Sequence, residues 1–367
     1  MSEALARELK ALFARGADTP LPDGAFDALA LRVFEHQHAH NAPYRAYALS
    51  QGRTPASVRH WTDVPLVPTT AFKALPLVCG APAPAAVTFR TSGTTAGERR
   101  GTHVVQDVEL YHASLRSAFR HWVLPDGARL PLLRLVPSSE ELPDSSLSHM
   151  GATVEEALCA PGGARLVDAA GGLDGRAWEE ALAHAVEAER PVLIFTTAFA
   201  LAAALEHLDR RDVRVGLPAG SRLMETGGFK GRRAAVSRDA LRAAVEDRLG
   251  IPATHIVAEY GMTELLSQFY DPVLRTGGAV RGVFQGPPWV RTRVLDPDTL
   301  REQPAGVTGV LAHHDLANLH SVSAVLTEDL GVARADGFEL LGRATGAELR
   351  GCSLTFEEIE RAQVHRV

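Results

Sequence analysis

Short apolar stretches alternate with helix-patterned segments through the middle of the chain, and this alternation constrains the fold most. Residues 191–196 have the pattern of a buried strand, and residues 222–226 and 255–259, each with a short apolar run, are expected to be strands as well. Residues 198–208 and 238–249 lie between them and repeat their apolar side chains with helical period. Strands that alternate with helices favour an α/β fold with largely parallel sheets, in which ligands bind where strands end and loops begin.

The chain before this region predicts helices and then an extended segment. Residues 1–50 have the apolar spacing of two helices. Residues 65–77 are punctuated by prolines and are expected to be extended, leading to a strand at 86–89.

The pattern after residue 285 changes to shorter alternating strands, expected at 307–312, 322–326 and 338–341. Two Asp- and Gly-containing segments, 328–331 and 335–337, are expected to be the turns between them. We therefore expect a core domain at 1–341, followed by a short C-terminal extension at 342–367. Within the core domain, residues 285–341 are expected to form a β-rich subdomain.

A loop rich in hydroxyl groups and glycine follows the strand expected at 86–89. Its candidate phosphate-binding residues are Thr91, Ser92, Gly93, Thr94, Thr95 and Gly97. Backbone N–H groups, hydroxyls and the guanidinium groups of Arg99 and Arg100 can surround a polyphosphate. The loop is not a Walker A motif, because no lysine follows at the required spacing. A polar surface turn is the alternative interpretation of the loop.

Composition narrows the class of protein. The chain has 367 residues and a net charge of -6, and no long basic run, which argues against nucleic-acid binding. Its three cysteines have neither metal-ligand spacing nor an even count, as is typical of a reducing compartment. The first residues lack the pattern of a signal peptide, and no apolar run reaches about 18 residues. We expect a cytoplasmic protein without a membrane partner.

Four stretches resemble motifs of the adenylate-forming superfamily, which includes acyl-CoA synthetases and adenylation domains. Residues 91–97 resemble its phosphate-binding loop, and residues 260–264 match its Tyr-Gly-x-Thr-Glu motif. Residues 326–331 are similar to its Thr-Gly-Asp motif, although Glu328 stands where the family usually has Gly. Gly342-Arg343 resembles the hinge between its two domains.

More narrowly, the chain resembles the LuxE-like branch of acyl-protein synthetases. The resemblance rests on similar length, on the proline-rich 65–77 segment that leads to the loop, and on Cys352 near the end. It implies a large adenylate-forming N-terminal-type domain with mixed parallel sheets and a smaller β-rich subdomain. Typical relatives add a C-terminal lid domain with a lysine; this chain stops shortly after Gly342, so the resemblance implies that the full lid is absent.

The resemblance implies ATP, AMP and Mg²⁺ as ligands and gives each motif residue a role. The hydroxyls of the 91–97 loop would hold the β- and γ-phosphates, and Thr263 would contact the α-phosphate. Glu264 would ligate Mg²⁺, a cation that prefers oxygen ligands. The Tyr260 ring, followed by Gly261, would stack on adenine. Asp329 would accept both ribose hydroxyls, with support from Arg343.

Two more residues are candidates for chemistry. No lysine lies beyond Lys230, which follows the strand at 222–226 in a glycine-rich turn, so Lys230 is the candidate for the missing lid lysine; a surface lysine is the alternative. Cys352 is the candidate acyl acceptor, flanked by glycine and by Arg350. Cys79 and Cys159 have the apolar surroundings of packed core cysteines.

The function that this resemblance implies is activation of a carboxylic acid, foremost a fatty acid, as acyl-adenylate, followed by acyl transfer to a thiol. The thiol would belong to Cys352 or to a partner protein, such as a reductase or a carrier protein. Two alternatives stay open: a ligase for an aromatic acid with an external acceptor such as coenzyme A, and a catalytically impaired nucleotide-binding subunit.

Overall fold

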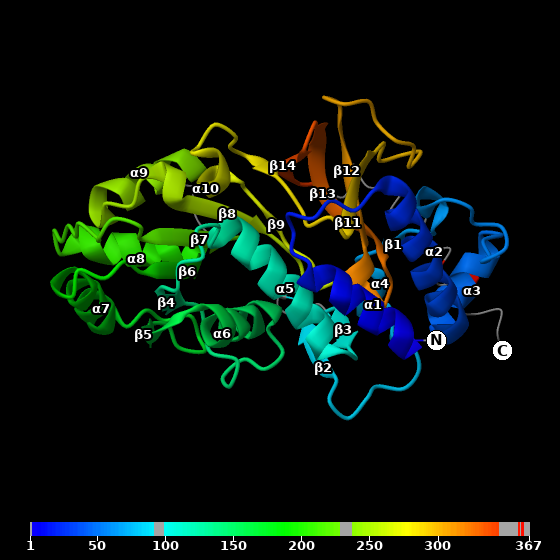
Figure 1. Cartoon of the computed structure of the whole chain (residues 1–367), viewed down its shortest axis with the longest axis horizontal. Helices are drawn as coiled ribbons and strands as arrows, with labels where there is room; N and C mark the ends of the chain where they lie inside the picture. The colour runs from blue at the N-terminus through cyan, green and yellow to red at the C-terminus, as the bar shows by residue number, and fades with distance from the viewer. Residues whose placement is uncertain (1, 92–98, 228–236, 345–358, 360, 363–367) are drawn as a thin grey trace. The chain divides into compact units, whose positions relative to one another are not determined.

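The computed structural model describes residues 2–91, 99–227, 237–344, 359 and 361–362. The chain divides into two compact units (Figure 1). The first unit consists of residues 1–118, 262–268 and 283–367, and the second of residues 119–261 and 269–282. The motif at 260–264 therefore crosses from the second unit into the first.

A six-stranded sheet with the order β5-β4-β6-β7-β8-β9 forms the centre of the second unit. Its strands are β4 (Pro131–Leu135), β5 (Ala160–Arg165), β6 (Leu193–Thr197), β7 (Arg222–Thr226), β8 (Ile256–Tyr260) and β9 (Phe269–Tyr270). All neighbouring pairs are parallel except β8 and β9, which are antiparallel. The α/β fold with parallel strands at 193–197, 222–226 and 256–260 confirms the prediction from the sequence.

Helices follow the strands of the second unit. They are the end of α5 (Val108–Val123), α6 (Ser146–Leu158), α7 (Gly175–Glu187), α8 (Ala198–Arg210), α9 (Arg238–Leu249) and α10 (Val273–Thr276). Four of them begin at a residue whose side chain accepts a hydrogen bond from the N–H three residues later, and these caps are Ser145, Asp174, Thr197 and Ser237. Such a cap satisfies one of the N–H groups that a helix leaves without an internal partner, which fixes where each helix starts.

Helices α7, α8 and α9 pack on one face of this sheet. Leu133, Ile194 and Leu223 of the strands are almost fully buried against a cluster that includes Trp178 and Leu201 of the helices. Burial of a large apolar side chain contributes about 1.5–3 kcal/mol, so this cluster stabilises the second unit.

The first unit is built around a second six-stranded sheet, whose path β10-β14-β13-β12-β11 is antiparallel. Its strands are β10 (Val283–Phe284), β11 (Val290–Leu295), β12 (Thr308–Asp315), β13 (Ala324–Arg334), β14 (Gly337–Arg343) and β1 (Val67–Pro68), which pairs in parallel with β13. A separate hairpin joins β2 (Val87–Arg90) to β3 (Thr102–Val105).

The predicted turn at 328–331 is wrong, because these residues continue β13, which bulges at residues 327–329 opposite Leu311 of β12. A bulge lets a strand accommodate an extra residue, so polar and glycine residues need not end it. The turn at 335–337 is confirmed, since it joins β13 to β14.

The N-terminal region has three long helices where the sequence predicted two: α1 (Ser2–Ala14), α2 (Asp23–His40) and α3 (Ala42–Ser50). A new helix, α3, begins after Asn41, because the Asn41 side chain accepts a hydrogen bond from the Tyr44 N–H at 3.2 Å and so caps the start of this helix. A short helix, α4 (Ala71–Ala74), also interrupts the segment that was expected to be extended.

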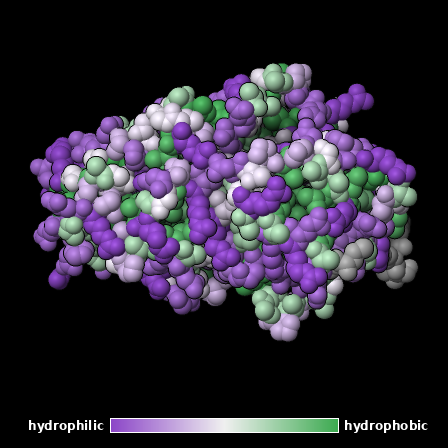
Figure 2. Space-filling model, viewed as in Figure 1, coloured by the Kyte–Doolittle hydropathy of each residue, from purple (hydrophilic) through white to green (hydrophobic). Residues whose placement is uncertain are grey.

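Hydrophilic side chains cover most of the face shown in Figure 2, and apolar ones gather only in small groups. Among the described residues, the large apolar side chains that remain exposed are Leu49, Val186, Phe199, Val307 and Leu341. None of the helices in the described part of the chain combines the length and apolar character that a membrane span requires.

Gly309 of β12 provides a test of how the strands pack in the sheet of the first unit. A Cβ atom there would collide with the backbone oxygen of Leu295 on the neighbouring strand β11. We expect Gly309→Ala to lower the free energy of unfolding by about 1–3 kcal/mol, because the backbone cannot move aside without breaking the ladder. Urea denaturation measures the change.

Gly24→Ala in α2 is the matched control, because a Cβ atom there meets nothing within 4 Å. Alanine favours a helix more than glycine does, so this variant should be as stable as the parent or slightly more so. Equal losses in the two variants would contradict the packing of β12 on β11.

Candidate functional site

Strand β8 of the second unit ends at Tyr260, the first residue of the Tyr-Gly-x-Thr-Glu motif. The Tyr260 side chain is mostly buried, and its ring centroid lies 5.9 Å from that of Phe269, its partner on β9. Because β8 lies beside the parallel strand β7, Tyr260 is at the carboxyl edge of the sheet, where α/β folds bind ligands.

Two buried glutamates that belong to no predicted motif share this edge. Glu225 of β7 and Glu259 of β8 are 4% and 5% exposed, and the Thr226 hydroxyl donates a hydrogen bond to a Glu259 carboxylate oxygen. Burial raises the pKa of Glu225 to about 6, and burial together with the nearby Glu225 carboxylate raises the pKa of Glu259 to about 7. In each strand the glutamate follows directly on apolar residues, Leu223-Met224 in β7 and Ile256–Ala258 in β8, and this pattern is the signal in the sequence that indicates them.

In the first unit, the backbone of Thr263 and Glu264 is held by two buried side chains. The Nδ1 atom of His103 lies 2.7 Å from the Thr263 carbonyl oxygen, and the Asn318 amide donates to the Glu264 carbonyl oxygen at 2.8 Å. The Glu264 side chain is 7% exposed. Neither His103 nor Asn318 stands in a motif, and no local pattern of the sequence indicates their role.

The residues after the motif are fixed by Asp315, the last residue of β12. Its carboxyl oxygens accept hydrogen bonds from the N–H groups of Leu266 and Ser267, at 3.0 and 2.8 Å, and from the Ser267 hydroxyl at 2.7 Å. The Ser267 hydroxyl also lies 3.1 Å from that of Ser114, which accepts from the Trp289 indole at 2.9 Å. Buried donors and acceptors are thus paired across four segments, which gives this backbone one conformation.

The predicted phosphate loop is described only at its base. The Thr91 N–H donates to the Gly101 carbonyl at 3.0 Å, and the Gly101 N–H donates to the Thr91 hydroxyl at 2.8 Å. Arg100 donates to the Thr91 carbonyl at 2.6 Å, so it helps to close the base of the loop. The other predicted residues of the loop, Ser92, Gly93, Thr94, Thr95 and Gly97, lie outside the described residues.

Asp329 and Arg343 face each other in the register of β13 and β14. The Asp329 N–H donates to the Thr327 hydroxyl at 3.0 Å, and this hydroxyl donates to the Leu311 carbonyl at 2.8 Å. The Arg343 guanidinium forms an ion pair with Glu328 at 3.0 Å. The residue that departs from the family motif is therefore the one that pairs with the predicted hinge arginine.

The two remaining candidates, Lys230 and Cys352, lie outside the described residues. Cys79 and Cys159 are buried, and burial raises the pKa of each thiol to about 12. A thiol with so high a pKa supplies almost no thiolate near neutral pH, so both cysteines are packed residues, as the sequence predicted.

Glu264 fits the expected role toward Mg²⁺ in its chemistry, since a carboxylate oxygen is the donor that this ion prefers. In the part of the chain that the structure describes, no three His, Cys, Asp or Glu side chains come together as a metal site. Mg²⁺ commonly takes one or two carboxylates and completes its shell with water and substrate phosphates, so a single glutamate suffices.

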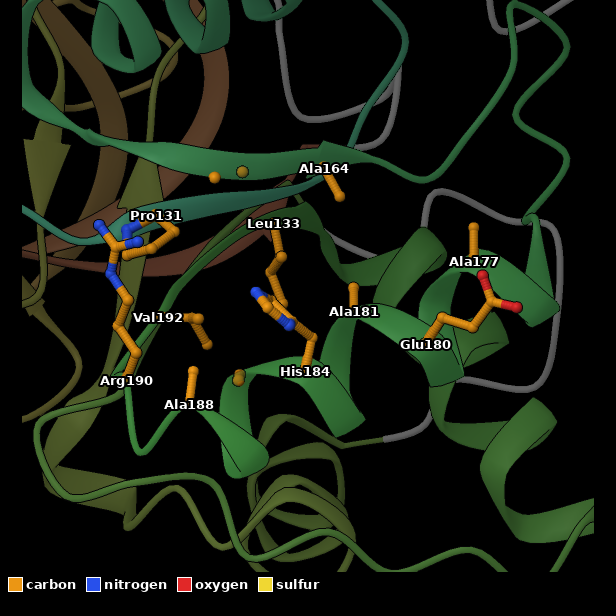
Figure 3. Close-up of a pocket in the computed structure, with 13 residues that line it drawn as sticks. Pro131, Leu133, Ala164, Ala177, Glu180, Ala181, His184, Ala188, Arg190 and Val192 are labelled. Carbon is orange, nitrogen blue, oxygen red and sulfur yellow. The ribbon is translucent and has the colours of Figure 1, made fainter.

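A cavity of about 330 Å³ lies elsewhere in the second unit, between α7 and strands β4 and β5 (Figure 3). Its walls include Leu133, Val192 and Ala181, with His184 and Arg190 among its polar residues. Because Gly162 and Gly163 contribute no side chains, the strand edge leaves this space open. Its lining contains none of the predicted site residues that the structure describes, so the cavity does not change the assignment of the site.

Glu259 gives a test of the buried acidic edge. Its folded-state pKa, about 7, lies above the ordinary 4.5, so its contribution to stability is fully present below pH 4.5 and is lost as pH rises through 7. Glu259→Gln stays neutral, so relative to the parent it should gain roughly 2–3 kcal/mol between pH 5 and pH 8. Urea denaturation at the two pH values measures this gain.

The exposed Glu156 of α6 provides the control, because Glu156→Gln removes a carboxylate that water already solvates. Its stability relative to the parent should be the same at both pH values. A flat difference for Glu259→Gln as well would mean that Glu259 is not buried in the folded protein.

The sequence of this chain is similar to that of known proteins. Residues 177–359 match the family described as acyl-protein synthetase, LuxE. The long-chain-fatty-acid–luciferin-component ligase of Vibrio harveyi is 29% identical over 106 residues, which are 27% of this chain and 26% of that ligase. The chain thus spans about a quarter of the length of this curated relative.

Two solved structures have a similar fold. A 2-hydroxyisobutyryl-CoA ligase in complex with 2-HIB-AMP superposes with a TM-score of 0.64 at 15% identity, over 88% of this chain and 69% of the ligase. ATP-bound MatB from Rhodopseudomonas palustris gives a TM-score of 0.50 at 17% identity, over 70% of this chain and 47% of MatB. The chain therefore shares the fold of these two enzymes, and its residues 177–359 match the acyl-protein synthetase family LuxE.

Proposed function

We propose that this protein uses ATP to activate a carboxylic acid as an acyl-adenylate. A carboxylate oxygen of the acid bonds to the α-phosphorus of ATP, and the bond from that phosphorus to the bridging oxygen breaks, so pyrophosphate leaves. The observation that supports the proposal is the 260–264 motif, which lies at the carboxyl edge of β8 and whose Thr263 and Glu264 carbonyls are held by buried side chains. The match to the LuxE family covers the same residues.

Each predicted site residue has a role in this reaction. The Tyr260 ring stacks on adenine, and Gly261 leaves room for the backbone to approach the nucleotide. Thr263 donates to the α-phosphate, and the residues of the 91–97 loop hold the β- and γ-phosphates. Asp329 accepts from the ribose hydroxyls, and Arg343 supports it. Lys230 is the proposed cation beside the reacting carboxylate and phosphate.

Mg²⁺ would be held by Glu264 and, when bound, would neutralise negative charge on the phosphates. The chain's own contribution is to place oxygen and nitrogen groups around a substrate whose charge is concentrated in the transition state. Fixed dipoles of this kind cost no reorganisation during the reaction, which is why they accelerate it. The buried partners of the 263–264 backbone supply this rigidity.

The acid is, in this proposal, a long-chain fatty acid. The support is the name of the Vibrio harveyi relative, a long-chain-fatty-acid ligase, together with the family match. The acyl group then passes to a thiol: the thiolate sulfur bonds to the acyl carbon, and AMP leaves. The acceptor in the chain is Cys352, because Cys79 and Cys159 are buried thiols with pKa values near 12. A protein partner receives the acyl group from it.

Substitution of Glu264 tests the activation step. Glu264→Gln keeps the size of the side chain but removes the charge that would ligate Mg²⁺. We expect exchange of pyrophosphate into ATP, measured with a panel of fatty and aromatic acids, to fall about a hundredfold or more. The exposed Glu156→Gln variant should exchange at the parental rate.

Two results would contradict the proposal. If the parent exchanges no pyrophosphate with any acid, the chain binds nucleotide without activating an acid. If Glu264→Gln exchanges as fast as the parent, the metal role of Glu264 is wrong.

Cys352→Ser tests the acyl acceptor. With labelled fatty acid, ATP and Mg²⁺, the parent should acquire a label that hydroxylamine removes, because a thioester is labile to this nucleophile. Cys352→Ser should exchange pyrophosphate normally and lose at least nine-tenths of the label, whereas Cys79→Ser should keep it. Label that persists in Cys352→Ser would place the acceptor elsewhere; exchange without any labelling would favour an external acceptor and the aromatic-acid ligase.

A further inference from the structure

A buried histidine connects the hairpin of the phosphate loop to the Tyr-Gly-x-Thr-Glu motif. His103 lies on β3, two residues after Gly101, which closes the base of the loop. Its ring is 1% exposed, and its centroid lies 5.6 Å from the Phe72 ring in an edge-on arrangement. Its Nδ1 atom is 2.7 Å from the Thr263 carbonyl oxygen, although the two residues are 160 positions apart in the chain.

The chemistry of this contact fixes the tautomer of His103. A carbonyl oxygen only accepts hydrogen bonds, so Nδ1 must carry the proton and donate it. Burial lowers the pKa of His103 to about 4, so the ring stays neutral and Nε2 is unprotonated. Among the described residues, the buried Nε2 atom has no hydrogen-bond partner. The contact with Thr263 is thus the polar interaction that orients this ring.

We propose that His103 is a positioning residue: through its Nδ1–H it holds the Thr263 peptide, and thereby the Thr263 and Glu264 side chains, in register with the base of the 91–101 loop. This inference rests on the proposed adenylation function. The Thr91–Gly101 pair fixes the loop end of the hairpin, and Asn318 fixes the next carbonyl, at Glu264. His103 is the link between these two arrangements within the first unit.

The position of the donor atom can be tested by substitution. The side-chain nitrogen of asparagine is as many bonds from the backbone as Nδ1 of histidine, whereas that of glutamine is one bond further out. His103→Asn should therefore keep the hydrogen bond to Thr263, and His103→Gln and His103→Leu should lose it. A packing role alone predicts the opposite order, because glutamine and leucine fill more of the space of the ring.

We expect His103→Asn to exchange pyrophosphate within about fivefold of the parent, and His103→Gln and His103→Leu to fall about ten- to a hundredfold in kcat. The Mg²⁺ concentration for half-maximal exchange should rise in the latter two, because Glu264 is displaced. Equal rates in the Asn, Gln and Leu variants, or an unchanged Mg²⁺ requirement in all three, would overturn the positioning role.

His313→Leu controls for the loss of a buried histidine. His313 of β12 is also fully buried, and its Nδ1 lies 2.9 Å from the hydroxyl of Thr292 on the neighbouring strand β11, so this hydrogen bond joins two strands of the sheet. This variant should be less stable to urea and yet exchange at the parental rate per folded molecule. If it loses exchange as His103→Leu does, loss of folding explains both.

The tautomer gives a readout that does not depend on activity. In protein labelled with ¹⁵N-histidine, the His103 signals are identified by their absence from His103→Asn. They should show a protonated Nδ1 and an unprotonated Nε2 from pH 5.5 to pH 8. An Nε2–H tautomer, or titration near pH 6.5, would overturn the inference. If the tautomer is as expected but the parent exchanges no pyrophosphate, it is the adenylation function that fails.

Discussion

A set of buried hydrogen bonds to backbone groups shapes the candidate site of the first unit. Asp315 accepts from two peptide N–H groups and one hydroxyl of residues 266 and 267, and Asn318 donates to the Glu264 carbonyl. Residues 264–267 form no helix or strand in the structure, so their peptide groups have no ladder to satisfy them. A buried peptide group without a partner costs about 1–3 kcal/mol, which makes these side chains obligatory for this conformation.

The same set of bonds extends to the N-terminal helices. The Gln37 amide of α2 donates to the Asn318 carbonyl at 2.8 Å, and its oxygen accepts from the Ser323 N–H at 3.1 Å. The Asn41 amide donates to the Ser321 carbonyl at 3.1 Å. A segment of the chain that carries no motif thus supports the loop beside Glu264, because buried polar groups must find partners wherever the fold brings them.

The sequence predicted the parts of the fold that periodicity encodes. Strands β6, β7 and β8 each contain a short apolar run, and their order with α8 and α9 follows directly from the alternation along the chain. The errors occurred where local composition and tertiary contacts disagree. Residues 328–331 look like a turn, yet they pair with β12 and β14 and absorb their irregularity in a bulge. Tertiary pairing overrode local propensity there.

The sequence also predicted some residues of the candidate site and not others. Tyr260, Thr263, Glu264 and Asp329 stand in recognisable motifs, so their types and spacing carried the prediction. His103 and Asn318 act through backbone carbonyls that are distant in sequence, and any residue type can offer a carbonyl. Such a contact leaves no trace in the sequence of the acceptor, which is why only the structure reveals it.

Glu328 shows how a departure from a motif is compensated within the fold. The Thr-Gly-Asp motif that this stretch resembles has glycine at this position, and here the Glu328 side chain forms an ion pair with Arg343 across β13 and β14. Both side chains are partly exposed, 28% and 53%, and a pair of this kind contributes about 0–1 kcal/mol. The pair is therefore weak enough for an anionic ligand to take over the guanidinium at little cost. The proposed support of Asp329 by Arg343 is compatible with Glu328, because Asp329 and Arg343 face each other in the register of the same two strands.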